Sequence, residues 1–452
     1  MAEGIRSTLA QASAWLRADW VGRDRGFEGV SSDSRQIAPG SLFVAIRGER
    51  HDGHDHVLEA ARRGAAAAMV ARRVHVAIPQ IIVPDTRIAL AQLASAWRTV
   101  LGTPLVALTG SNGKTTTKEM IAAILGLAGP VLATRGNLNN DLGVPLTLLR
   151  LAPQHRFAVI EMGANHPGEI AYLTAIARPD VALLNNAGPA HLEGFGSVEG
   201  VARAKAEIFD GLREGGIAVV NGDSEFALMW RLRAAPHRVV AFGLEAEDAD
   251  VSAAWEAQGE GSALHVRHAR GEFDAKLALP GRHNVMNALA ATAASLALGA
   301  TPSMVQAGLA AMRPVHGRME QRRGRGGALI IDDTYNANPA SLRAGMEVLA
   351  AKRGRRLLAL GDMGELGETG DALHAEAGRT ARELGLDGLF ATGELSRHAV
   401  TAFGAGAQHF PDQASLIAAL QSELAPDVTV LVKGSRSRRM ENVVAALAAN
   451  EV

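Results

Sequence analysis

The residues with the clearest chemical potential form a glycine-rich loop at residues 109–117, Thr-Gly-Ser-Asn-Gly-Lys-Thr-Thr-Thr. An apolar run at residues 105–108 precedes the loop and a helical pattern beginning at Lys118 follows it, so we expect a buried strand that turns through glycines into a helix. Such a turn leaves several backbone N–H groups unpaired and aimed at one spot, where the helix dipole also favours negative charge. The loop is therefore predicted to bind a polyphosphate, and we expect ATP.

Individual residues of the loop have distinct uses in this prediction. Gly110 and Gly113 let the backbone approach an anion closely. Lys114 adds a mobile positive charge, and the Thr115 hydroxyl stands where a magnesium ion would bind. Leu108 occupies the place of the first glycine in the general phosphate-loop pattern, so a plain glycine turn between strand and helix is the alternative. Lys-Thr-Thr after glycine is more than such a turn needs.

The chain around the loop has the pattern of an α/β protein. Short apolar runs alternate with helical patterns, which predicts mainly parallel sheets covered by helices on both faces. With 452 residues the chain is too long for one core. We expect a small α/β domain at residues 1–84, a central ATP-binding domain with a phosphate-loop-type sheet at 85–313, and a Rossmann-like C-terminal domain at 314–452. The expected strands lie at 41–46, 67–70, 76–83, 105–108, 157–160, 181–184, 217–220, 239–242, 328–331, 356–360, 388–391 and 428–432.

Other segments have weaker patterns. Residues 56–63 and 87–101 are predicted to be helices. Short alternating runs at 263–267 and 273–279 predict a hairpin inserted in the central domain.

Composition excludes several classes of protein. The formal net charge of -1 argues against a general nucleic-acid binder. The absence of cysteine excludes disulfides and thiolate metal sites. The first twenty residues show no signal-peptide pattern, and the most apolar long stretch, 286–300, is shorter than a membrane span. We expect a cytoplasmic monomer with no membrane insertion.

Two further residues stand at predicted strand ends. Glu161 ends the run at 157–160, and His191 follows the run at 181–184. The carboxyl ends of parallel strands face the same crevice as the phosphate loop, so a carboxylate and an imidazole can converge there on a metal-bound nucleotide. Alone, a histidine or glutamate at a strand end is more often a loop hydrogen-bonder.

Six motifs taken together resemble, in this order, the Mur ligase superfamily, whose members extend the cell-wall peptide. They are the phosphate loop, Asn-Leu-Asn-Asn-Asp-Leu-Gly-Val-Pro at 137–145, Glu-Met-Gly at 161–163, His-Leu-Glu at 191–193, Gly-Arg-His-Asn-Val-Met-Asn at 281–287 and His-Gly-Arg-Met-Glu at 316–320. Three more motifs, at 332–339, 360–368 and 433–441, are similar to the branch that attaches D-alanyl-D-alanine to UDP-N-acetylmuramoyl-tripeptide. The Asp-Asn-Pro-Arg signature of the branch that adds a diamino acid is absent.

This resemblance implies ATP and Mg²⁺ as cofactors. The residues implied to bind ATP are Gly110, Ser111, Asn112, Gly113, Lys114, Thr115, Thr116, Asn284, Asn287, Arg318 and Asp333. The residues implied to hold or orient metal are Thr115, Glu161, His191 and Lys205, and those implied to act in catalysis are Lys114, Glu161, His191 and Lys205. Lys205 matches a position that is carbamylated in several superfamily members; an ordinary or substrate-contacting lysine is the alternative.

The implied substrates are UDP-N-acetylmuramoyl-tripeptide and D-alanyl-D-alanine. The residues implied to contact the uridine nucleotide are Ser34, Arg35, Asp52, Gly53 and His54, for which plain solvated loops are the alternative. Asn139 and Asn140 are implied to contact substrate, and the candidates for the dipeptide pocket are Tyr335, Asn336, Asn338, Ser435 and Arg436.

The implied reaction activates the tripeptide carboxylate as an acyl phosphate, which the dipeptide amine then attacks. We expect the third domain to close on the central domain, because Arg318 and Asp333 lie beyond the hinge. Three alternatives stay open: the enzyme that adds the third peptide residue, a folylpolyglutamate synthetase, and a nucleotide-dependent switch without ligase activity. The third residue of the tripeptide, diaminopimelate or lysine, is also open.

Overall fold

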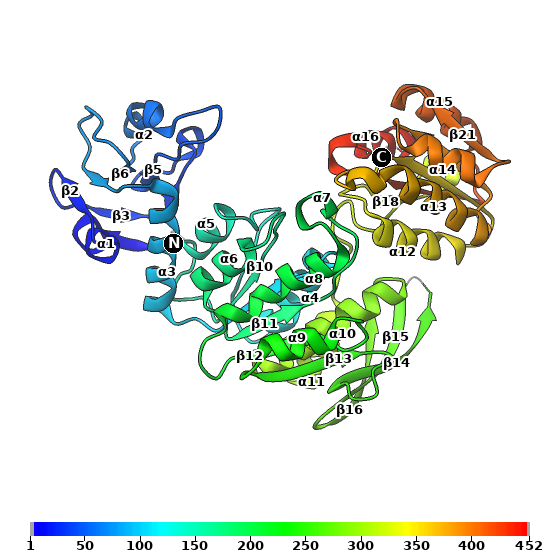
Figure 1. Cartoon of the computed structure of the whole chain (residues 1–452), viewed down its shortest axis with the longest axis horizontal. Helices are drawn as coiled ribbons and strands as arrows, with labels where there is room; N and C mark the ends of the chain where they lie inside the picture. Colours follow the sequence, from blue (N-terminus) through cyan, green and yellow to red (C-terminus); the bar gives the residue numbers. More distant parts are fainter. Residues whose placement is uncertain (1–3, 260, 450–452) are drawn as a thin grey trace.

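The computed structural model describes residues 4–259 and 261–449. Three lobes follow one another in chain order, coloured blue, cyan to green, and yellow to red in Figure 1. Each lobe contains a mainly parallel sheet with helices packed on it. The expected α/β class with three units is confirmed.

The first lobe carries a five-stranded sheet in the order β2-β7-β6-β5-β4, with a separate β1-β3 pair. Only β2 runs antiparallel to its neighbour in the five-stranded sheet. Its elements are β1 Arg6–Thr8, α1 Leu9–Leu16, β2 Asp19–Val21, β3 Gly26–Glu28, β4 Val30–Ser31, β5 Leu42–Val44, α2 Val57–Arg62, β6 Ala67–Val70 and β7 Gln80–Ile82. The helix α3, Thr86–Leu101, leads into the central lobe.

The central lobe contains a nine-stranded sheet in the order β16-β15-β14-β13-β12-β11-β8-β10-β9. The strands from β9 to β14 along this order are parallel, as the apolar runs of β8, β10, β11, β12 and β13 predicted, whereas β9 and β14 were not expected. Its strands are β8 Leu105–Thr109, β9 Val131–Ala133, β10 Phe157–Glu161, β11 Val181–Leu184, β12 Ile217–Asn221, β13 Arg238–Gly243, β14 Val251–Gln258, β15 Gly261–His268 and β16 Gly271–Leu277. Its helices are α4 Lys114–Gly126, α5 Gly143–Leu148, α6 Glu169–Ala177, α7 Leu192–Phe195, α8 Val198–Ala206, α9 Ala227–Ala234, α10 Arg282–Ala297 and α11 Pro302–Ala310.

Two expectations for the central lobe were wrong in detail. The β15–β16 hairpin is not an insertion: with β14 it forms an antiparallel extension of the main sheet. Helix α4 begins at Lys114 rather than Lys118, because Gly113 takes a left-handed conformation and turns the chain directly into the helix. The threonines after Lys114 are therefore helical and buried, although residues 109–117 were expected to form the loop.

The third lobe contains a six-stranded sheet in the order β17-β18-β22-β19-β20-β21, parallel except for β17. The two edge strands were not expected, because Glu-Gln-Arg-Arg and Ala-Gln-His-Phe lack an apolar run. Its elements are β17 Glu320–Arg323, β18 Leu329–Asp333, α12 Pro339–Ala350, β19 Arg355–Gly361, α13 Gly370–Glu383, β20 Gly388–Thr392, α14 Ser396–Phe403, β21 Ala407–Phe410, α15 Gln413–Glu423, β22 Val428–Lys433 and α16 Glu441–Leu447.

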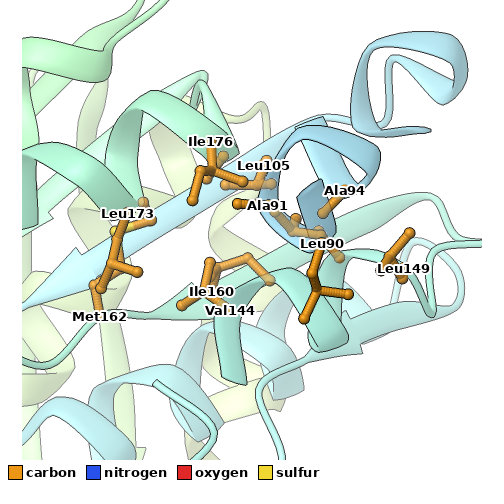
Figure 2. Close-up of a cluster of buried hydrophobic side chains, with 14 of the residues drawn as sticks. Leu90, Ala91, Ala94, Leu105, Val144, Leu149, Ile160, Met162, Leu173 and Ile176 are labelled. Carbon is orange, nitrogen blue, oxygen red and sulfur yellow. The ribbon is translucent and has the colours of Figure 1, made fainter. Parts of the chain in front are cut away.

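The first and central lobes share a hydrophobic core, whereas the third lobe has cores of its own. One cluster runs from Ile5 and Leu9 in the first lobe, through α3, to Leu105 and Ile160 in the central sheet. Figure 2 shows its side chains from α3, α5, α6, β8 and β10 pointing toward one another. The third lobe has its own clusters on the two faces of its sheet. Among the described residues, no helix has the length and apolar character needed to cross a bilayer.

Candidate active site

A cavity of about 1190 Å³ lies where the central and third lobes meet. Its wall includes the phosphate loop, the carboxyl ends of β10, β11 and β12, the start of α10 and the loop that leads into α12. Helix α12 lies on the side of the third lobe that faces the central lobe (Figure 1). The predicted site residues that line this cavity are Ser111, Asn112, Gly113, Lys114, Thr116, Asn139, Asn140, Glu161, His191, Asn284, Asn287, Arg318, Asp333, Tyr335, Asn336 and Asn338.

The phosphate loop is tightly enclosed at its second glycine. Gly113 has φ +75, and a Cβ there would lie 2.2 Å from Asn287 Oδ1. Only glycine fits such a position, because both the backbone angle and the space exclude a side chain. Next in the chain, the Lys114 ammonium donates to the carbonyl of Gly110 at 2.7 Å. Loss of water around Lys114 lowers its pKa, while the negative charge of Glu161 opposes the shift.

Two asparagines that were not assigned a role hold the loop in shape. Asn186 Oδ1 accepts the backbone N–H of Asn112 at 2.8 Å, and Asn185 Nδ2 donates to the Asn112 carbonyl at 3.1 Å. Asn185 also donates to Asn287 Oδ1 at 2.9 Å, which ties the loop to α10. The sequence could have predicted this role, because both asparagines directly follow β11 at the carboxyl edge of a parallel sheet, where ligands bind.

Hard oxygen ligands gather beside the loop. The Thr115 hydroxyl donates to Glu161 Oε2 at 2.9 Å, and Asn139 Nδ2 donates to Glu161 Oε1 at 2.9 Å. Glu161 is buried without a cationic partner among its hydrogen bonds to described residues. A hydroxyl and a carboxylate in contact are donors that suit Mg²⁺, so the residues present fit this ion.

His191 lies on the same cavity but is held from the third lobe. Its Nδ1 is 2.6 Å from Glu365 Oε2. This hydrogen bond and the charge of His191 lower the pKa of Glu365. Both residues have left-handed backbones, with φ 54 at His191 and φ 61 at Glu365. Glu365 was not assigned a role from the sequence.

Lys205 is buried behind the cavity rather than on its wall. It is 1% exposed, and its ammonium lies 6.0 Å from the centre of the Phe195 ring. Burial lowers the pKa of Lys205 well below its usual value, and the positive charge of Lys114 adds to the shift. The neutral amine is thereby favoured, which is the form that can add carbon dioxide.

The third lobe reaches the phosphate loop directly. Arg318 donates to the Thr115 hydroxyl at 3.0 Å and stacks on Tyr335, 4.1 Å from the ring centre. Asn338 Nδ2 donates to Asn112 Oδ1 at 2.7 Å. The side-chain oxygen of Asn338 accepts the backbone N–H of Ser341 and so caps α12. These contacts bring residues more than two hundred positions apart onto one loop.

The other predicted residues of the third lobe do not contact the phosphate loop through a hydrogen bond between described residues. Asp333 lines the cavity, but its carboxylate is 2.5 Å from the buried ammonium of Lys433. Ser435 and Arg436 lie outside the cavity wall; the backbone N–H of Arg436 donates to Asn336 Oδ1 at 3.4 Å.

The first-lobe candidates form a separate group, away from the cavity. Ser34 is buried and donates to Glu59 at 2.8 Å. The His54 ring lies 2.6 Å from Asp52 Oδ1 and accepts the backbone N–H of Ala71 at 2.8 Å. A Cβ at Gly53 would lie 2.7 Å from Ile46 N. Arg35, in contrast, is mostly exposed and paired with Asp33.

Asn284 and Asn287 share the buried start of α10. The Asn284 side chain donates to the Pro280 carbonyl at 2.7 Å and accepts from Asn287 at 3.3 Å. Both side chains line the cavity next to the phosphate loop, as expected for a site that binds the rest of a nucleotide.

Known proteins share this architecture. The chain matches the family models "Mur ligase family, catalytic domain" at residues 26–98, "Mur ligase middle domain" at 108–295 and "Mur ligase, glutamate ligase domain" at 317–436. It is 45% identical over 449 residues to the UDP-N-acetylmuramoyl-tripeptide--D-alanyl-D-alanine ligase of Escherichia coli K12, covering 99% of both chains.

Solved structures are similar over most of the chain. A crystal structure of MurF from Acinetobacter baumannii superposes with a TM-score of 0.93 at 37% identity, covering 98% of this chain and 99% of that one. MurF from Thermotoga maritima, in complex with ADP, gives a TM-score of 0.83 at 31% identity, covering 92% and 96%. From its matched domains, its full-length relatives and its arrangement of lobes, the chain belongs to the Mur ligase family.

Proposed function

We propose that this chain is an ATP-dependent ligase that joins UDP-N-acetylmuramoyl-tripeptide to D-alanyl-D-alanine through a new C–N bond. Curated relatives of that name are 36–45% identical over nearly the full length. The observation that carries the proposal is the cavity in which a phosphate loop, an acidic and hydroxyl pair and an arginine from another lobe meet. Three lobes suit a reaction that must hold a nucleotide-linked acceptor, ATP and a dipeptide together.

The chemistry needs activation because a carboxylate is a poor electrophile with a poor leaving group. In the proposed reaction the tripeptide carboxylate attacks the γ-phosphorus of ATP, which breaks its bond to the bridging oxygen, releases ADP and forms an acyl phosphate. The dipeptide amine then attacks the acyl carbon, and phosphate leaves. The first step brings an anion toward a polyanion, so Lys114 and Arg318 supply the positive charge that lowers this repulsion.

Magnesium is part of this proposal. Thr115 and Glu161 are proposed to hold the ion, with His191 and a carbamylated Lys205 nearby. When bound, Mg²⁺ neutralises phosphate charge and orients the oxygens of the transferred group. We propose that the lobe contact through Arg318 helps to exclude water from this space when substrates are bound, which would protect an acyl phosphate from hydrolysis.

Residues of the first and third lobes are proposed to contact the two substrates. Arg35 is mostly exposed and offers positive charge to a diphosphate, whereas Ser34, Asp52, Gly53 and His54 are proposed to shape that surface. Tyr335, Asn336 and Asn338 line the cavity on the third-lobe side, where the dipeptide is proposed to bind, with Ser435 and Arg436 behind them.

The test is a coupled assay of phosphate release and peptide product. The proposed ligase releases ADP and phosphate only when both the muramoyl-tripeptide and D-alanyl-D-alanine are present. A switch would hydrolyse ATP with no amine consumed. A third-residue ligase would use the dipeptide-linked acceptor with a single amino acid, and a folylpolyglutamate synthetase would use folate and glutamate, so either result would contradict the proposal.

A further inference from the structure

One arm of the cavity lies away from the third lobe, between α3, α6 and the loop that follows β9. Its charged and aromatic wall includes Arg87 in the first turn of α3, Asp141 in that loop, and Glu169 and Tyr172 on α6. Helices α3, α5 and α6 pack together beside the first lobe (Figure 1). This arm is therefore the part of the cavity nearest the lobe proposed to hold the nucleotide tail of the acceptor.

Arg87 and Asp141 form an ion pair in which each side chain still has hydrogen-bonding atoms available to a ligand. Arg87 Nη1 lies 2.5 Å from Asp141 Oδ2, and the two side chains are 42% and 35% exposed. Among the described residues, no other side-chain hydrogen bond engages Arg87, and Asp141 Oδ1 accepts none. A guanidinium has five donors and Arg87 lines the cavity, so donors that do not bind Asp141 remain for a ligand. Each ion can thus bind a ligand group of opposite charge without breaking the pair.

Tyr172 lines the same cavity and is near enough to be affected by the charges of the pair. Burial raises the pKa of its hydroxyl, the negative charges of Asp141 and Asp85 add to that shift, and Arg87 opposes it. The tyrosine ring is 38% exposed and offers an apolar wall for the methylene groups of a ligand.

The arm lies next to the reacting centre. Thr115 is bonded to Glu161, and Glu161 is bonded to Asn139. Asp141 is two residues beyond Asn139, so a trans backbone limits the separation of their Cα atoms to about 7.6 Å. In the acceptor, the carboxylate that reacts and the side chain of the third residue share one Cα. When that carboxylate is at the phosphate loop, the side-chain end falls within reach of the arm.

Resting on the proposed function, we propose that Arg87 and Asp141 read the side chain of the third residue and select one that ends in both an ammonium and a carboxylate, as in diaminopimelate. The Arg87 fork binds the terminal carboxylate with paired hydrogen bonds, and Asp141 Oδ1 accepts from the terminal ammonium. A lysine side chain offers only the ammonium, and it would meet the positive charge of Arg87 beside Asp141. The arginine both attracts the dicarboxylic amino acid and rejects lysine.

The experiment compares kcat/KM for the tripeptide acceptors that carry meso-diaminopimelate and L-lysine, in the wild-type chain and in Arg87→Gln. We expect Arg87→Gln to lower the ratio of kcat/KM for the diaminopimelate acceptor to kcat/KM for the lysine acceptor by roughly ten- to a hundredfold. Most of this loss should come from a higher KM for the diaminopimelate acceptor. Arg231→Gln is the matched control, because it removes an ion pair of the same 2.5 Å length outside the cavity. The control should leave the ratio unchanged.

A substrate variant keeps the test decisive if Arg87→Gln fails to fold. An acceptor whose terminal side-chain carboxylate is amidated should lose a similar factor with the wild-type chain, because it retains the ammonium and removes only the group that Arg87 binds. Equal kcat/KM for the diaminopimelate, amidated and lysine acceptors, or equal losses on both natural acceptors in Arg87→Gln, would overturn the inference. Ligation of none of the three by the wild-type chain would instead refute the proposed function.

Discussion

Lys114 is the residue whose charge the proposed chemistry needs most. It points back onto the loop carbonyl of Gly110, and its pKa is lowered because water is excluded. An ammonium that is already poorly hydrated loses little solvation when a phosphate arrives. Its role should therefore appear in catalysis rather than in binding of the acceptor, which is proposed to bind mainly to another lobe.

We expect Lys114→Ala to reduce kcat for ligation on the order of a hundred- to a thousandfold, because one preorganised charge is lost from the transition state. The dissociation constant for UDP-N-acetylmuramoyl-tripeptide, measured by calorimetry, should stay within about twofold of the wild type, since 0.4 kcal/mol or less corresponds to such a change. Lys276→Ala, at an exposed lysine of β16, is the control for general effects. Near-normal turnover in Lys114→Ala would contradict the assignment.

Lys205 tests whether a buried amine is converted into a metal-binding carboxylate. We expect Lys205→Ala to lose most activity and to regain part of it when short carboxylates such as formate or acetate are added, because they replace the carbamate. Mass spectrometry at neutral pH should show 44 Da, about the mass of carbon dioxide, on the wild-type peptide. Activity of Lys205→Ala equal to the wild type without any additive would support an unmodified structural lysine instead.

At the level of elements, the turn from β8 into α4 decides where the nucleotide can bind. Its geometry depends on Gly113, whose backbone angle and close neighbours exclude any side chain. The same helix ends at Gly126, where an added Cβ meets open space. These two glycines allow a comparison within one helix.

Gly113→Ala is expected to destabilise the chain by about 1–3 kcal/mol and to abolish detectable ATP binding, because the loop must move away from Asn287. Gly126→Ala should be neutral or stabilising by up to about 1 kcal/mol, with ATP binding unchanged. Thermal unfolding and nucleotide titration measure both effects. Equal behaviour of the two variants would show that the tight contact at Gly113 has no energetic consequence.

The turn before α2 is held by a charged clamp. The backbone N–H of His54, its ring and Arg72 lower the pKa of Asp52 to about 2. A lowered pKa in the folded state means that the ionised carboxylate stabilises the fold above its unfolded pKa, and that this stability is lost as pH falls toward about 2.

We therefore expect Asp52→Asn to lower stability by on the order of 1–2 kcal/mol at neutral pH. The difference in melting temperature from the wild type should narrow as pH falls from about 5 toward 3. Asp55→Asn, in the same turn but 72% exposed, is the control and should show little difference at any pH. If the difference in melting temperature between the wild type and Asp52→Asn stayed constant with pH, the charge of Asp52 would not be the source of the stabilisation.

At the scale of the molecule, the lobes are joined in two different ways. The first and central lobes share one hydrophobic cluster, in which Trp15 and Trp97 lie with ring centres 6.5 Å apart. The third lobe keeps its own cores and meets the phosphate loop and His191 through polar side chains. Because polar contacts exchange with water at little net cost, we propose that the third lobe moves as a unit and the first does not.

A variant that combines Arg318→Ala, Asn338→Ala and Glu365→Ala removes three of these ties. Each contributes about 1 kcal/mol, so the variant should favour an open arrangement and show a larger radius of gyration by small-angle scattering. ATP and acceptor should compact the wild type to a greater degree than the variant. A matched control replaces Arg203, Arg233 and Arg343, which form exposed ion pairs outside the cavity. The same scattering curve for all three proteins would argue against closure by the third lobe.

The sequence by itself determined the parallel strands, the phosphate loop and the family. A continuous apolar run must be buried on both faces, so β8, β10, β11, β12, β13, β18, β19, β20 and β22 could be located from local pattern alone. Glycine and lysine at fixed spacing likewise carry their chemistry within a few residues. Where the local pattern was weak, as in the edge strand of Glu-Gln-Arg-Arg and the start of α4, the sequence misplaced or missed the element.

Tertiary structure alone decided which side chains meet. Three side-chain contacts join segments that are far apart in the chain: Arg318 with Thr115, Asn338 with Asn112, and Glu365 with His191. No local sequence pattern predicts such contacts. The same holds for Arg87 and Asp141, whose pairing gives one arm of the cavity its charge. Side-chain contacts of this kind depend on how whole sheets pack, because one lobe must be folded before it can present a residue to another.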